Sequence, residues 1–83
     1  MITIQDFQFA SFEKKCDVVT TYSDYLISRV SKDCKVYLYY VDAFFIEVYY
    51  SSADKKVRGI VAFNDTTRLE PYAEMISLAD LNL

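Results

Sequence analysis

The chain has 83 residues, 53% of them hydrophobic and 17% aromatic, and its formal net charge is −3. This length predicts a single domain over residues 1–83, because domains rarely have fewer than about 50 residues and most exceed 100. The acidic balance argues against a nucleic-acid partner, which clustered Lys and Arg would bind. Asp42 and Glu47 interrupt the longest apolar stretch. We therefore expect no membrane span.

Cofactor and metal chemistry lack the residues that they need. The chain has no histidine, and its single glycine, Gly59, lies in an apolar run. Phosphate-binding and calcium-binding loops both need glycine, and a structural zinc site needs four ligands where only Cys16 and Cys34 are available. The N-terminus shows no signal-peptide pattern. We expect no cofactor, no metal, no enzymatic activity, reduced thiols and a cytoplasmic location.

The first predicted element is a helix from Phe9 to Val19. Phe9, Phe12, Cys16 and Val19 recur at helical spacing, which places them on one apolar face. Ser11 is positioned to cap this helix through its side-chain oxygen. The short polar and β-branched residues after position 19 predict its end.

Four strands are predicted next, rich in the β-branched and aromatic residues that suit a pleated surface. They cover Tyr25–Val30, Lys35–Val41, Phe44–Tyr50 and Lys56–Phe63. Short polar turns separate them, and parallel pairing would need connections of about a dozen residues or more. The pattern therefore predicts an antiparallel meander.

A second helix is predicted after this sheet. Thr67 and Glu70 have the spacing of a capping box, and Pro71 fits the first helical turn. The apolar stripe consists of Leu69, Tyr72, Ala73 and Ile76, and the leucines of the tail 77–83 predict that it docks on the domain. The fold class is thus α+β: a four-stranded antiparallel meander flanked by an N-terminal and a C-terminal helix.

Alternation sorts the two central strands into faces. We assign the core to Val36, Leu38 and Tyr40 together with Phe44, Ile46, Val48 and Tyr50. We assign the second face to Tyr37, Tyr39 and Val41 together with Phe45, Glu47 and Tyr49. A solvated face would be more polar than this second one. We expect it to contact a second copy of the chain, as a homodimer, or another protein; the alternative is that the C-terminal segment folds over it.

Glu47 is the one charged residue in an apolar strand, so it needs a partner. Arg29 could supply a bidentate ion pair, and with Tyr37, Tyr39 and Tyr49 the group could bind a small ligand or act as an acid–base set. The structural alternative is an ion pair that keeps the sheet in register. The candidate interface or ligand face is therefore Arg29, Tyr37, Tyr39, Phe45, Glu47 and Tyr49.

Three hypotheses for function follow. The first is a non-enzymatic interaction module that self-associates through the aromatic face. The second is a small-molecule-binding protein or enzyme built on Glu47 and Arg29. The third is an acidic partner protein of the immunity-protein or antitoxin kind, because Glu70, Glu74 and Asp80 follow the last basic residue, Arg68.

The string from Val36 to Tyr50, with the later Leu69-Glu70-Pro71-Tyr72, resembles a group of short bacterial proteins with an LY…FYVEV…LxxY pattern. The resemblance covers roughly residues 9–81. It implies a single domain from a bacterial source and carries no activity to transfer. One departure is the turn at Ser23-Asp24, which lacks the glycine expected there.

Overall fold

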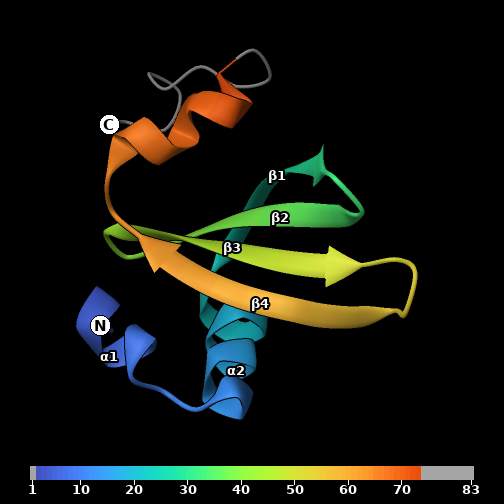
Figure 1. The fold of residues 1–83 in the computed structure, drawn as a ribbon. Helices are drawn as coiled ribbons and strands as arrows, with labels where there is room; N and C mark the ends of the chain where they lie inside the picture. The colour runs from blue at the N-terminus through green and yellow to red at the C-terminus, as the bar shows by residue number, and fades with distance from the viewer. Residues whose placement is uncertain (1, 74–83) are drawn as a thin grey trace.

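Four consecutive strands pair in the order β1-β2-β3-β4 and form one antiparallel sheet, which confirms the predicted meander and the α+β class (Figure 1). The computed structural model describes residues 2–73. Its elements are the helices α1 (Ile4–Gln8) and α2 (Phe12–Tyr22), the strands β1 (Asp24–Ser31), β2 (Cys34–Val41), β3 (Phe44–Ser51) and β4 (Lys56–Phe63), and a 3-10 helix, η1 (Thr66–Tyr72). Within these residues, no helix has the length and apolar character needed to cross a membrane.

Each hairpin turn contains one residue with left-handed backbone. Lys32, Asp42 and Lys55 have φ angles of 56°, 52° and 57°. Turns of this hand match the right-handed twist of the paired strands, and they usually use glycine or asparagine. The chain forms its hairpins without glycine at these positions. Asp42 has a second role, because its carboxylate accepts a hydrogen bond from the backbone N–H of Ile2 at 2.9 Å.

The N-terminal helix differs from the prediction. Two short helices replace the single helix expected over residues 9–19, and Phe9 lies between them with 90% of its surface exposed. The break follows from two caps: Thr3 and Asp6 form a capping box at the start of α1, and Ser11 caps α2 as predicted. The apolar face was also misassigned, because Phe12 is exposed and α2 buries Val18 and Val19.

The C-terminal helix is a 3-10 helix rather than an α-helix. Asp65 is its N-cap and accepts a hydrogen bond from the Thr67 N–H at 3.0 Å, so the expected capping box of Thr67 and Glu70 is wrong. Pro71 lies near its end, not in its first turn. Leu69 and Tyr72 are fully buried as predicted. The expected contacts of Ile76 and the tail fall outside the described residues.

The helices lie on opposite faces of the sheet (Figure 1). On the helix side, Phe7 of α1 and Val18 of α2 pack against Phe44 and Ile46. On the η1 side, Leu69 and Tyr72 pack against Leu38, Phe45 and Phe63. The ends of the hairpins β1–β2 and β3–β4 extend beyond all three helices, as Figure 1 shows.

The strand register corrects the predicted pairing of faces. Val41 and Phe44 are partners across a two-residue turn, and Tyr39 and Tyr37 pair with Ile46 and Val48. Directly opposed residues point to the same face. Odd-numbered residues of β2 therefore share a face with even-numbered residues of β3, so the predicted grouping of even-numbered residues from both strands is wrong. Tyr37 and Tyr39 consequently lie on the helix side, and Glu47 lies opposite Leu38 on the η1 side.

Candidate functional site

Glu47 lies at the centre of the sheet, on the face that η1 covers. Its neighbours across the strands are Leu38 on β2 and Val61 on β4. Only 2% of Glu47 is exposed, and it is the one buried side chain with a formal charge in residues 2–73. A carboxylate in such a place is costly unless hydrogen bonds and opposite charges compensate it.

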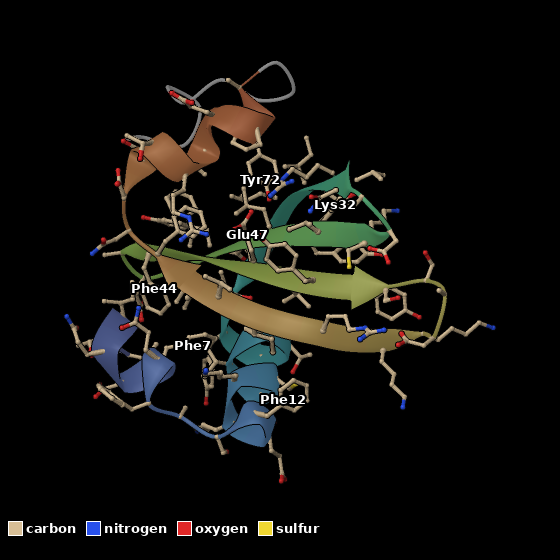
Figure 2. All side chains as sticks on the ribbon, in the orientation of Figure 1. Phe7, Phe12, Lys32, Phe44, Glu47 and Tyr72 are labelled. Atoms are coloured by element: carbon tan, nitrogen blue, oxygen red, sulfur yellow. The ribbon has the colours of Figure 1, made fainter. Side chains whose placement is uncertain are left out.

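Four side chains, from β1, η1 and its own strand β3, surround the Glu47 carboxylate. Tyr72 of η1 donates its hydroxyl to Oε2 at 2.6 Å, and an Arg29 nitrogen of β1 lies 3.2 Å from the same oxygen. Tyr49 donates its hydroxyl to Oε1 at 3.3 Å, and an Arg68 nitrogen lies 3.7 Å from it. We call these five residues the Glu47 cluster. Figure 2 shows Glu47 and Tyr72 facing each other between the sheet and η1.

The arginines also stack on aromatic rings. The Arg29 guanidinium lies 5.2 Å from the centre of the Tyr72 ring, and that of Arg68 lies 5.1 Å from the Phe63 ring. Burial, followed by the hydrogen bond to Glu47, raises the pKa of Tyr72 well above its usual range. Tyr72 therefore stays protonated as a donor, and both carboxylate oxygens are occupied.

A shallow hollow of about 550 Å³ opens over this cluster. Its walls are Arg29, Glu47, Tyr49, Thr67, Arg68, Glu70 and Pro71. Glu47 is one of the residues that line this hollow. The contacts of Glu47 match the structural alternative, an ion pair with Arg29, although the pair has one nitrogen–oxygen contact and not two. The cluster fastens η1 to the sheet.

Sequence reasoning found Glu47, Arg29 and Tyr49 but missed Tyr72 and Arg68. A signal for Tyr72 was present, because a tyrosine on a buried stripe needs a partner for its hydroxyl. Arg68 carried no such signal, since its side chain is half exposed.

Phe45 lies on the same face as Glu47 but is 2% exposed, so it belongs to the core. Its ring stacks on Phe63 with a centroid distance of 5.5 Å and contacts Tyr40 at 5.0 Å. The predicted set of six residues is therefore divided. Arg29, Glu47 and Tyr49 meet in the cluster, Phe45 is core, and Tyr37 and Tyr39 lie on the other face.

Tyr37 and Tyr39 belong to a tyrosine group with Tyr25 of β1. The Tyr25 ring centre lies 5.6 Å from that of Tyr39 and 6.3 Å from that of Tyr37. Burial and the neighbouring phenols of Tyr25 and Tyr37 raise the pKa of Tyr39. The ammonium of Lys35 lies 5.5 Å from the centre of the Tyr37 ring.

The helices cover only part of this face. Val30 is 77% exposed and Tyr25 is 54% exposed, and Val57, which pairs with Tyr50, is also exposed. The six residues that we call the open tyrosine face are Tyr25, Val30, Tyr37, Tyr39, Tyr50 and Val57. It spans all four strands on the helix side.

No protein-family model matches the chain, and no curated protein or solved structure is significantly similar to it. The resemblance to short bacterial proteins thus stays a prediction.

Proposed function

We propose that the chain is a non-enzymatic interaction module that self-associates through its open tyrosine face. The observation that carries this proposal is the group of Tyr25, Tyr37 and Tyr39, packed against one another and left partly exposed on the helix side. Tyrosine suits a protein contact because its ring is apolar and its hydroxyl remains hydrogen-bonded at the rim.

Strand β2 gives the open tyrosine face a positive charge, unlike the acidic chain as a whole. The chain is acidic overall, so two copies repel each other over most of their surfaces. Lys35, stacked on Tyr37, is the charged residue that β2 contributes to this face. A contact between two such faces brings tyrosines and valines together without opposing carboxylates from β2.

The Glu47 cluster supports the non-enzymatic part of the proposal. A general acid or base needs a free proton site within reach of a substrate. Both oxygens of Glu47 already have partners within residues 2–73, and 2% of the residue is exposed. The immunity-protein hypothesis stays a prediction, because two of its three acidic residues, Glu74 and Asp80, lie outside the described residues.

The solution mass tests this proposal. Light scattering on size-exclusion chromatography should give a wild-type mass of twice 9.7 kDa. Tyr37→Glu should give folded monomers, because a carboxylate in a buried contact is costly. Phe9→Glu is the matched control, since Phe9 is exposed in the α1–α2 connection, away from the sheet, and its replacement should leave the dimer intact.

Circular dichroism separates loss of association from loss of folding. A folded monomeric Tyr37→Glu next to a dimeric Phe9→Glu supports the open tyrosine face as the contact. A wild-type monomer at all concentrations contradicts self-association. A Tyr37→Glu variant that stays dimeric removes this face from the contact.

A further inference from the structure

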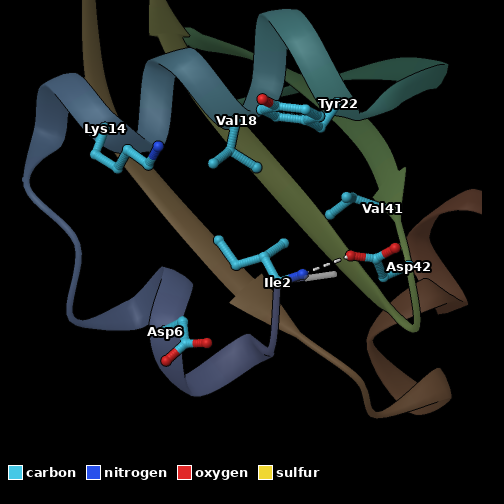
Figure 3. Close-up of a pocket in the computed structure, with 7 residues that line it drawn as sticks. All are labelled: Ile2, Asp6, Lys14, Val18, Tyr22, Val41 and Asp42. Carbon is cyan, nitrogen blue, oxygen red and sulfur yellow. Dashed lines mark hydrogen bonds between the residues drawn. The ribbon is translucent and has the colours of Figure 1, made fainter.

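A second hollow lies at the other end of the helix side, away from the open tyrosine face. It has a volume of about 570 Å³, within the range of about 300–1,000 Å³ typical of small-molecule sites. Its walls come from the N-terminal segment, α2 and the β2–β3 turn (Figure 3). The lining residues are Ile2, Asp6, Lys14, Val18, Tyr22, Val41 and Asp42.

The floor of this groove is apolar. Val18 and Val41 are 1% and 4% exposed, and Figure 3 shows the Ile2 side chain between them and α1. The Ile2 N–H donates to Asp42, which holds the N-terminal segment against the turn. The middle of the groove therefore offers aliphatic contact and no charge.

The charged residues lie at the ends. Lys14, Val18 and Tyr22 follow one another at intervals of four residues along α2, so Lys14 and Tyr22 are separated by about 12 Å along the helix axis. Figure 3 shows Lys14 and Asp42 on opposite sides of Ile2, with Tyr22 farther along α2 and Asp6 on the same side as Lys14. In residues 2–73, neither Lys14 nor Asp42 makes a salt bridge.

Each of the two aspartates accepts one backbone N–H through one carboxylate oxygen. Asp6 belongs to the capping box of α1, where its carboxylate accepts the Thr3 N–H. Asp42 is held in a left-handed turn, and one of its oxygens accepts the Ile2 N–H. Its second oxygen accepts no hydrogen bond from residues 2–73.

We propose that this groove binds an extended ligand with an aliphatic middle, an ammonium group at the Asp42 end and a carboxylate at the Lys14 end. A straight-chain ω-amino acid has this chemistry. So does the last residue of a protein that ends in lysine, with its side-chain ammonium and terminal carboxylate. A compact α-amino acid fits less well, because its two charges are adjacent while those of the groove are not.

The probe is 6-aminohexanoate, titrated into the full chain and followed by the ¹H–¹⁵N shifts of Ile2, Val18 and Asp42. We expect saturable shifts of these amides. Hexylamine and hexanoate, which each lack one charge, should bind about tenfold more weakly, since a hydrogen bond to a charged group accounts for about that factor. Nα-acetyl-lysine tests the protein-terminus source: comparable binding assigns the site to chain ends, and binding of 6-aminohexanoate alone assigns it to free ω-amino acids.

Asp42→Asn is the decisive variant. Asparagine tolerates left-handed backbone and keeps an acceptor for the Ile2 N–H, so the turn is preserved while the charge is removed. We expect about tenfold weaker binding of 6-aminohexanoate. Asp33→Asn, in the exposed β1–β2 turn, is the matched control and should bind as the wild type does.

Three results would overturn the site. One is the absence of saturable shifts up to about 50 mM, far above a 1 mM dissociation constant. Another is equal binding of hexylamine or hexanoate. The third is unchanged binding by Asp42→Asn. None of them bears on self-association, because the groove shares no residue with the open tyrosine face.

Discussion

The two faces of this sheet are covered through different kinds of contact, polar on one face and apolar on the other. On the η1 side, the single carboxylate of Glu47 collects hydrogen bonds and charges from β1, β3 and η1. On the helix side, apolar packing of Phe7, Val18 and Val19 covers the region near the β2–β3 turn and leaves tyrosines open farther along. A polar cluster of a few residues can fasten a short helix to the sheet. Apolar packing covers only the part of the sheet that its side chains contact.

The largest expected effect is at the centre of the polar cluster. Glu47→Ala leaves the Arg29 and Tyr72 donors without their acceptor, and breaking a buried pair in this way costs about 3–5 kcal/mol. Urea denaturation measures this loss. Glu70→Gln, an exposed change on η1, should stay within about 0.5 kcal/mol. Glu47→Gln, which keeps an acceptor, provides a folded variant if the alanine variant does not fold. Equal urea midpoints for the wild type and Glu47→Gln would show that the negative charge of Glu47 contributes nothing to the stability of the fold.

Phe7→Ala is the counterpart on the helix side. It empties a fully buried position against Phe44, whose ring centre is 5.8 Å away. Truncation of a core phenylalanine costs about 3–5 kcal/mol. The Lys15 ammonium lies 5.8 Å from the centre of the Phe7 ring, so the truncation also removes a cation–π contact. Urea denaturation measures the loss, and a loss below about 1 kcal/mol would contradict a core position for Phe7.

Tyr72→Phe should change the pH dependence as well as the stability. It removes the hydroxyl that donates to Glu47, at a cost of about 1.5–3 kcal/mol near neutral pH. The pKa of Tyr72 is raised in the folded state, so its contribution is complete below the unfolded pKa of about 10 and is lost as pH rises above it. Wild-type stability should therefore fall more steeply above pH 10 than that of Tyr72→Phe, as measured by urea midpoints. Parallel curves would contradict a buried, protonated Tyr72.

The smallest effect is expected on the open tyrosine face. Tyr37→Thr keeps a residue that suits a strand and removes a partly exposed ring. In the monomer it should change the free energy of unfolding by less than about 0.5 kcal/mol, the range of ordinary surface substitutions. A loss comparable to that of Tyr72→Phe would show that Tyr37 is part of the core.

The meander was predictable because each of its turns is short and polar and each strand is rich in β-formers. The faces were misassigned although the information was present. A two-residue turn at Asp42-Ala43 makes Val41 and Phe44 partners, which places odd residues of β2 with even residues of β3. The break at Phe9 could have been found from Thr3 and Asp6, whose capping-box spacing marks a separate helix start.

The C-terminal element shows where sequence reasoning stops. The stripe of Leu69 and Tyr72 predicted a buried helical face, which a 3-10 helix also provides. Whether such a segment forms an α-helix or a 3-10 helix depends on its N-cap and on its tertiary contacts. Here the Asp65 cap and the contacts of the Glu47 cluster stabilise the 3-10 helix. Arg68 joined that cluster from an exposed position that no pattern distinguishes.

The hydrogen bond between Ile2 and Asp42 has a consequence for the order of folding. Every strand pairs only with its neighbour in the chain, so the hairpins can form from contacts of short sequence separation. The bond from Ile2 joins residues 40 positions apart, and that from Tyr72 to Glu47 joins residues 25 apart. Such distant closures lose more chain entropy than hairpin turns do. We expect the segment at Ile2 and the helix η1 to dock last onto a sheet that is already formed, and to be released first when the protein unfolds.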